Sequence, residues 1–288
     1  MSAKSKKHPA HDPPAWHPTE SPAYRLASED LEFLTKDDLR PLRLQLELLK
    51  PEWYLRQEEV RSTIVVFGSA RLLAPEVADK RVSELESALQ AAPDDPQRRR
   101  DLQRARKQQS YARYYSQAQR FSRLVSCRFQ KPGQRDFVIV TGGGPGIMEA
   151  ANRGAHEVAA RSIGLNITLP HEQRPNPYIS PELCFQFRYF AIRKMHFLMR
   201  AKALVAFPGG YGTLDELFEV LTLIQTGKIT PLPVVLIGEA FWRRAIDFDF
   251  LVEEGMIAST DRELFQIVDS ADQAVQIIDR FYGGRPPA

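Results

Sequence analysis

Short apolar runs rich in β-branched residues alternate with longer amphipathic segments from residue 63 onward. Six runs have the length and composition of buried strands, and they span 63–67, 137–141, 163–169, 203–207, 233–237 and 265–268. The segments between them have the apolar spacing of helices, and they span 76–90, 97–129, 146–161, 189–202, 214–226, 240–254 and 271–281. Alternating strands and helices predict βαβ units with right-handed crossovers. The sequence therefore predicts an α/β fold, a Rossmann-like doubly wound parallel sheet with helices on both faces.

The residues before this domain have a different pattern. Residues 1–22 combine prolines with Lys, His and Ser, which predicts a flexible tail because little apolar surface can offset the cost of ordering. Residues 23–60 are rich in leucine after a helix cap at Ser28, and Pro41 and Pro51 interrupt the pattern, which predicts an N-terminal helical arm in pieces. Such an arm needs a surface to pack on, either the main domain or a second copy. The remaining chain divides into one domain, 61–283, and a second tail, 284–288.

Composition and charge narrow the class of protein. Lys plus Arg is 39 and Asp plus Glu is 36, so the net charge of +3 creates no global field that attracts nucleic acid. No apolar run approaches the roughly 18 to 20 residues of a membrane helix, and the N-terminal lysines lack the apolar core of a signal peptide. We therefore expect a cytoplasmic protein without membrane contact. Cys127 and Cys184 have no metal-ligand spacing, so we interpret them as buried thiols and expect no metal and no disulfide.

A local basic run lies inside the segment 97–129. Its members are Arg98, Arg99, Arg100, Arg104, Arg106, Lys107 and Arg113. One interpretation is a solvated helix face whose arginines pair with acids, and the other is contact with RNA or DNA. The run contains no aromatic stacking pattern, so we favour the solvated face.

A glycine-rich turn, Gly142–Gly146, follows the second predicted strand and opens a helix. Glycines let the backbone approach a ligand closely, and free N–H groups at a helix start favour an anion. The dinucleotide fingerprint differs, because it follows the first strand and needs an acid at the end of the next one, where this chain has 167–170, Ile-Thr-Leu-Pro. The turn therefore argues against NAD and leaves either a phosphate site or tight packing of strand and helix.

A second glycine-rich turn, Pro-Gly-Gly-Tyr-Gly-Thr at 208–213, follows the fourth predicted strand. A capping box between Thr213 and Glu216 would explain the helix start but not the three glycines. A phosphate bound to the amides of Gly210, Gly212 and Thr213, with the Thr213 hydroxyl as a further donor, explains both features. The lysine of an ATP-hydrolysing P-loop is missing, which argues against ATP hydrolysis.

Several cations precede that turn, on the predicted helix 189–202 and directly before it. They are Arg188, Arg193, Lys194 and Arg200, and Ile192, Met195 and Met199 have the spacing of a buried stripe. Taken one by one, each cation fits a surface position.

The sequence PGGYGTLDE at 208–216, preceded by Arg193-Lys194, resembles the LOG (Lonely Guy) family of nucleotide phosphoribohydrolases, known earlier as lysine-decarboxylase-like proteins. Its motif PGGxGTxxE is complete here. FGSAR, GGGPGIMEAANRGA and LPHEQRPNPYIS add support, so the resemblance covers about residues 60–282 and is closest to the longer-chain branch. Short members lack the arm and a helical insertion at about 76–110, and they commonly carry an acid where this chain has Ala191 and Ile192.

The resemblance implies hydrolysis of the N-glycosidic bond of a nucleoside 5′-monophosphate, AMP or a cytokinin riboside 5′-monophosphate, with release of free base and ribose 5-phosphate. It implies a homodimer and no cofactor. The implied catalytic pair is Arg193 and Glu216. The expected substrate-binding residues are Gly143, Gly144, Glu172, Lys194, Gly209, Gly210, Tyr211, Gly212, Thr213, Leu214, Asp215 and Thr222.

The chemistry of these residues fits that reaction. A carboxylate at Glu216 can stabilise the oxocarbenium character that develops at the ribose, and a bound phosphate places the sugar beside it. We expect Arg193 to hold Glu216 by a charge-assisted bond and to keep it ionised at neutral pH. A non-catalytic carrier or sensor of nucleotides or other phosphorylated ligands is the alternative. A lysine decarboxylase would need a Schiff-base lysine for PLP, and no motif supplies one.

Overall fold

The computed structural model describes residues 17–131, 133–169 and 174–286, and the chain divides into two compact units, Met1–Leu46 and Glu47–Ala288. The described part of the first unit is helical, as the sequence predicts for the arm. Its elements are η1 Pro18–Glu20, η2 Pro22–Tyr24, α1 Leu31–Leu34, η3 Asp37–Leu39 and the start of α2 Arg40–Gln57. The 3-10 turns η1 and η2 begin within residues 17–22, which the sequence analysis assigns to the tail. Asp30 caps α1 by accepting a hydrogen bond from the Phe33 amide. The predicted break at Pro51 is wrong, because α2 continues through that residue.

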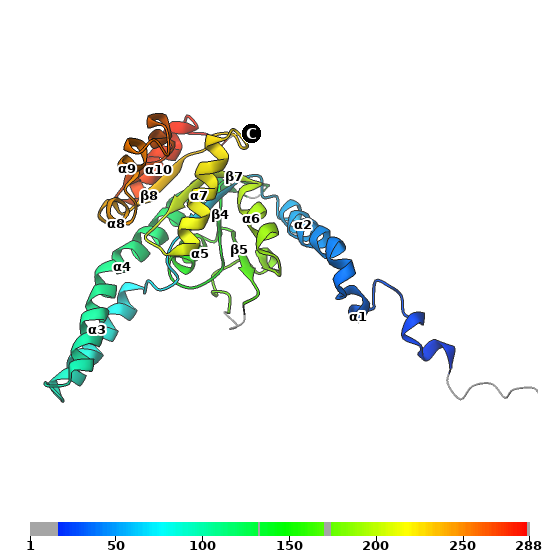
Figure 1. The fold of residues 1–288 in the computed structure, drawn as a ribbon, viewed down its shortest axis with the longest axis horizontal. Coiled ribbons are helices and arrows are strands. Elements are labelled where there is room, and N and C mark those ends of the chain that lie inside the picture. Colours follow the sequence, from blue (N-terminus) through cyan, green and yellow to red (C-terminus); the bar gives the residue numbers. More distant parts are fainter. Residues whose placement is uncertain (1–16, 132, 170–173, 287–288) are drawn as a thin grey trace, which may run out of the picture. The chain divides into compact units, whose positions relative to one another are not determined.

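The second unit is built on a seven-stranded parallel sheet in the order β6-β5-β4-β1-β7-β8-β9 (Figure 1). The strands are β1 Thr63–Phe67, β4 Val138–Thr141, β5 Ser162–Ile167, β6 Cys184–Phe187, β7 Ala201–Ala206, β8 Val234–Ile237 and β9 Gln266–Val268. The short β2 Gln130–Lys131 and β3 Gln134–Arg135 form a separate antiparallel pair. All six predicted strands are present, and the sequence analysis missed β6 of the main sheet and the short pair β2 and β3.

Helices connect the strands and cover both faces of the sheet. They are α3 Pro75–Gln90, α4 Pro96–Phe129, α5 Ile147–His156, α6 Phe190–Leu198, α7 Tyr211–Gln225, α8 Glu239–Ala245, α9 Phe248–Glu253 and α10 Ala271–Phe281, with the 3-10 turns η4 Pro181–Leu183 and η5 Ser259–Leu264. The predicted helix 240–254 is wrong in one respect, because an extended residue, Ile246, and the cap Asp247 divide it into α8 and α9.

Alternation along the strands separates two hydrophobic cores. Val65 and Phe67 of β1 face a core that includes Phe197 of α6 and Leu217 of α7, together with Leu55 of α2. The alternate β1 residues, Ile64 and Val66, face a second core that receives side chains from three other helices: Tyr115 and Phe121 of α4, Ile147 of α5, and Ala274 and Ile278 of α10. Both faces of the sheet are therefore buried, as expected for a parallel sheet.

The helical hairpin formed by α3 and the first half of α4 has a small core of its own. Val82 of α3 packs with Leu102 and Ala105 of α4, and Figure 1 shows the two helices side by side. Most cations of the basic run are bonded within this hairpin, for example Arg104 to Asp101 and Arg106 to Glu86. This confirms the interpretation as a solvated helix face for those residues.

Two expectations about burial are wrong. Cys127 and Cys184 are both exposed, since Cys127 lies on the outer side of α4 and Cys184 on the edge strand β6. Met195 and Met199 of α6 are 48% and 47% exposed, because α6 turns His196 and Phe197 toward the sheet. Among the described residues, no helix is long and apolar enough to cross a membrane.

Candidate active site

The strand order of the sheet reverses between β1 and β7, and open α/β sheets bind ligands at the carboxyl ends of strands at such a point. A cavity of about 820 Å³ lies there. Its lining consists of Phe67–Leu72, Lys107, Tyr111, Gly142, Met148, Phe190, Arg193, Pro208–Glu216 and Phe241. Phe67 accepts a hydrogen bond from the Phe207 amide, and the Ser69 amide donates to the Pro208 carbonyl over 2.9 Å. The turns after β1 and β7 are therefore held side by side.

The start of α7 differs from the predicted capping box. The helix begins at Tyr211 after Gly210, and no side chain caps it, so Thr213 and Glu216 already lie inside the helix. The Thr213 amide donates to the Gly210 carbonyl over 3.0 Å, which removes it from the expected phosphate donors. Tyr211 and Gly212 are the first two helical residues, whose amides have no acceptor within the helix. The amides of Tyr211 and Gly212 are therefore available to an anion, and both residues line the cavity.

The glycines of this turn have two different roles. A Cβ atom at Gly209 would lie 2.1 Å from the Thr213 Oγ1 atom, so the fold itself requires glycine there. At Gly210 and Gly212 no described atom lies within 4 Å of a Cβ position. Packing therefore does not explain these two glycines, whereas a ligand that approaches the backbone would.

Glu216 is a buried carboxylate, only 6% exposed, on the wall of this cavity. Burial raises the pKa of Glu216 from 4.5 to about 7, the charges of Lys194 and Arg193 oppose that rise, and Glu219 and Asp215 add to it. The Lys194 Nζ atom lies 3.4 Å from the Glu216 Oε2 atom. A carboxyl group with such a pKa exists in both protonation states near neutral pH, which suits a group that interacts with a reacting sugar.

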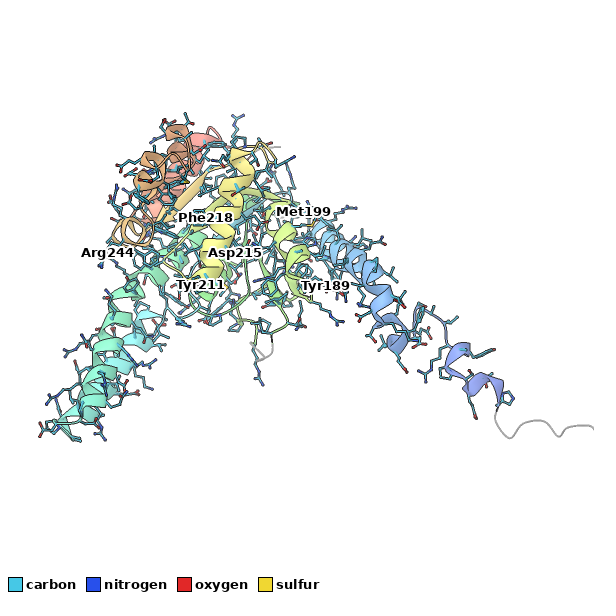
Figure 2. The ribbon with its side chains drawn as sticks, in the orientation of Figure 1. Tyr189, Met199, Tyr211, Asp215, Phe218 and Arg244 are labelled. Atoms are coloured by element: carbon cyan, nitrogen blue, oxygen red, sulfur yellow. The ribbon has the colours of Figure 1, made fainter. Side chains whose placement is uncertain are left out.

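Lys194 joins three carboxylates of α7. Its Nζ atom lies 2.9 Å from Asp215 Oδ2 and 2.6 Å from Glu219 Oε2, besides the contact with Glu216. Burial lowers the pKa of Lys194, but the bonds to Glu219 and Asp215 outweigh that effect and leave the pKa raised. The lysine is therefore charged at neutral pH and fixes α6 to α7. Figure 2 labels Tyr189 and Met199, which flank α6 at its two ends, and Tyr211, Asp215 and Phe218 on α7.

Arg193 lines the cavity but does not hold Glu216 as expected. Its Nε atom donates to the Leu165 carbonyl over 2.7 Å, its guanidinium lies 5.2 Å from the centroid of the Phe197 ring, and a Cβ atom at Gly142 would lie 2.7 Å from one of its nitrogens. Burial lowers the pKa of Arg193, and the charge of Glu216 opposes that effect. Within the described residues, the ion pair of Glu216 is with Lys194. The prediction that Arg193 bonds to Glu216 is therefore wrong, although the charge of Arg193 still lowers the pKa of Glu216.

The helix that carries Arg193 and Lys194 is anchored by α2. The Glu47 carboxylate accepts hydrogen bonds from the amides of Arg188 and Tyr189 over 2.8 Å and 3.2 Å, and so satisfies backbone donors at the start of α6. The Glu47 carbonyl has lost its helical donor because residue 51 is proline, and it lies 3.2 Å from the His196 Nε2 atom.

At the other end of α6, Arg200 is paired with Glu52 over 2.7 Å and donates to the Val60 carbonyl. The second half of α2 therefore fixes α6 at its start, its middle and its end.

The first glycine turn contributes less than expected. Gly142 lines the cavity, whereas Gly143 and Gly144 are buried outside that lining, and the Asn176 side chain donates to both of their carbonyls. A Cβ atom at Gly143 would lie 2.2 Å from the Asn166 Oδ1 atom, and its φ is +75°. Close packing against Asn166 of β5 and the positive φ therefore explain Gly143, and Asn176 holds the backbone of both glycines.

Two other expected substrate-binding residues lie elsewhere. Thr222 is exposed, and its hydroxyl donates to the Phe218 carbonyl, away from the cavity. Glu172 lies outside the described residues. In contrast, Gly209–Asp215 all line the cavity.

The lining residues that were not predicted from the sequence include two cations and two aromatic residues, Arg71, Lys107, Tyr111 and Phe241. Arg71 ends the FGSAR motif, which marks the turn after β1, so the sequence offered a signal for it. Lys107 and Tyr111 belong to α4, and only the packing of that helix brings them to the cavity.

Residues 148–278 match a family model described as possible lysine decarboxylase. The cytokinin riboside 5′-monophosphate phosphoribohydrolase LOG3 of Arabidopsis thaliana is 32% identical over 153 residues, which cover 51% of this chain and 69% of that protein. The phosphoribohydrolase LOG4 of Arabidopsis thaliana is 31% identical over 153 residues, which also cover 51% of this chain and 69% of that protein. Among solved structures, the molybdenum cofactor carrier protein of Chlamydomonas reinhardtii gives a TM-score of 0.43 at 16% identity and covers 77% of this chain and 99% of its own.

Proposed function

The chain belongs to the LOG family, also described as possible lysine decarboxylases, and we propose that it hydrolyses the N-glycosidic bond of nucleoside 5′-monophosphates. The expected substrates are AMP first, and then cytokinin riboside 5′-monophosphates. The products are the free base and ribose 5-phosphate. The single observation that carries this proposal is the buried Glu216, whose pKa is raised to about 7, on the same cavity as the amides at the start of α7 that have no acceptor within the helix.

The spacing of these two features suits a nucleotide. Glycine amides at the start of α7 and its positive dipole end suit the 5′-phosphate, and Glu216 lies one turn further along the same helix. A substrate anchored by its phosphate has its ribose fixed relative to the carboxylate, so the binding energy of a remote group contributes to the reaction.

In the reaction, the bond between C1′ and the base nitrogen breaks, water adds to C1′, and the water proton balances the charge of the departing base. The ionised Glu216 stabilises the positive charge that develops at the sugar. Lys194 positions Glu216 and lowers its pKa against the effect of burial. Arg193, fixed by the Leu165 carbonyl, presents its charge to the same cavity.

We also propose that the active protein is a homodimer. Apolar side chains are exposed on two helices that the Lys194–Glu219 ion pair joins: Phe190 and Met195 on α6, Met199 directly after it, and Phe218 on α7, with 54%, 48%, 47% and 38% exposure. Exposed apolar side chains that gather on one face are typical of an interface. A second copy of the chain that covers this face would bury these four side chains next to the cavity.

The test is incubation of the purified protein with AMP, GMP, CMP, UMP and a cytokinin riboside 5′-monophosphate, with base release followed by chromatography. Glu216→Gln and Arg193→Ala should abolish or strongly reduce release. Glu84→Gln is the matched control, since Glu84 is an exposed carboxylate on α3. Binding of a monophosphate without release from any nucleotide would instead favour the carrier or sensor.

A further inference from the structure

The cavity has a charge requirement that its glycine turn does not meet. A phosphate monoester carries about −1.5 to −2 charges at pH 7. The turn Pro208–Thr213 supplies amide donors but no basic side chain, in contrast to a P-loop, where a lysine reaches the phosphates. A basic side chain from another element would therefore add to the attraction that the amides and the dipole of α7 provide.

The two cations of α6 are already engaged. Lys194 lies within 4 Å of Asp215, Glu216 and Glu219, so acidic groups of α7 already neutralise its charge. Arg193 donates to the Leu165 carbonyl and stands beside Glu216, whose pKa it lowers. Both cations act on the carboxylate end of the cavity.

Two further cations line the same cavity. Arg71 belongs to the turn after β1, and its amide donates to the Ser69 hydroxyl over 3.1 Å. The Ser69 amide in turn donates to the Pro208 carbonyl, so the backbone of Arg71 is held next to the glycine turn. Among the described residues, no carboxylate lies within 4 Å of the Arg71 guanidinium.

Lys107 of α4 is the second of these cations. Its charged neighbours Arg104 and Arg106 have acidic partners, Asp101 and Glu86. Lys107 instead lies 5.0 Å from the centroid of the Tyr111 ring, and both side chains line the cavity. In the part of the chain that the structure describes, no carboxylate lies within ion-pair distance of Lys107.

We infer that Arg71 and Lys107 are the cations that bind the 5′-phosphate of the substrate, beside the glycine turn. The inference rests on the proposed function for the identity of the substrate, and it assigns the phosphate-recognition role to residues outside the motif PGGYGTLDE. It also gives the helical hairpin of α3 and α4 a role, because that hairpin brings Lys107 to the cavity. Tyr111 holds the ammonium group by a cation–π contact and so orients it.

The test measures binding of ribose 5-phosphate and of adenosine by calorimetry to Arg71→Ala, Lys107→Ala and the double variant. Arg104→Ala is the matched control, because it removes the same charge from the same helix away from the cavity. We expect each single variant to bind ribose 5-phosphate about tenfold more weakly, since hydrogen bonds to charged groups are stronger than neutral ones. Adenosine affinity and the melting temperature should stay at wild-type values.

Three results would overturn the inference: unchanged affinity for ribose 5-phosphate in the double variant, an equal loss for adenosine, or an equal loss in Arg104→Ala. The experiment is independent of turnover. Ribose 5-phosphate binding that depends on Arg71 and Lys107 in a protein without base release would refute the hydrolase and leave the phosphate site in place. Base release that both alanine variants retain with an unchanged KM would refute the phosphate site and leave the hydrolase.

Discussion

Replacement of Glu216 by glutamine should stabilise the fold, and the gain should depend on pH. The carboxyl has an ordinary pKa of 4.5 in the unfolded chain, and burial raises the pKa to about 7 in the fold. Below 4.5 both states are protonated and the carboxyl causes no difference. Between 4.5 and 7 the unfolded state ionises first, so the wild type loses stability as the pH rises, and the loss is complete above about 7.

The magnitude follows from these two pKa values. A change from 4.5 to about 7 corresponds to about 3 kcal/mol of unfolding free energy. Glutamine has the shape of the protonated carboxyl and never ionises, so Glu216→Gln avoids this loss. For a unit of this size, each kcal/mol changes the melting temperature by about 2 to 4 °C, so the variant should melt about 6 to 12 °C higher than the wild type at pH 8.

The assay is urea denaturation and thermal melting of wild type, Glu216→Gln and the exposed control Glu84→Gln at pH 5, 6, 7 and 8. The advantage of Glu216→Gln should be small at pH 5 and largest at pH 8, while Glu84→Gln should follow the wild type throughout. A difference that stays constant with pH, or a wild type that is more stable at pH 8, would refute the reasoning from burial.

Three other variants test separate parts of the account. Gly212→Ala should keep the wild-type melting temperature, because its Cβ meets no described atom, and it should raise KM for AMP about tenfold or more by filling the space at the amides. Gly209→Ala should instead melt at a lower temperature, because its Cβ clashes with the Thr213 side chain. Equal melting temperatures of the two variants would count against these roles. Glu47→Ala should lower the unfolding free energy by about 1 to 2 kcal/mol through loss of the hydrogen bonds that hold the backbone directly before α6, and denaturation beside Glu47→Gln, which keeps one acceptor, should show a smaller loss for glutamine. Charged substitution of the exposed pair, Met195→Glu with Met199→Glu, should convert the proposed dimer to a monomer in light scattering, and a wild type that is already monomeric would contradict the proposed interface.

The sheet could be predicted from the sequence because buried parallel strands leave a strong pattern. The runs that became β1, β4 and β7 are continuous and apolar, and each ends in a glycine or proline turn. β6 left a weaker pattern, since Cys184 and Gln186 are exposed and only the alternate residues are buried. An edge strand of four residues with one solvated side resembles a loop in sequence.

The candidate site was predictable at the level of its motif but not of its contacts. The motif marks the residues that gather at the end of β7, and the structure brings Glu216 and Arg193 to one cavity. Sequence spacing could not show that Arg193 bonds to the Leu165 carbonyl, that Lys194 takes the place beside the carboxylate, or that α4 carries Lys107 to the cavity. These contacts depend on tertiary packing of elements far apart in the chain.

The most direct measurement of the central claim is the stoichiometry of products from AMP, with adenine and ribose 5-phosphate quantified together for wild type and Glu216→Gln, beside AMP binding to both. The account predicts equal amounts of the two products from the wild type, and AMP binding without product release from Glu216→Gln. Undiminished release from Glu216→Gln, or AMP binding without any product from the wild type, would contradict it.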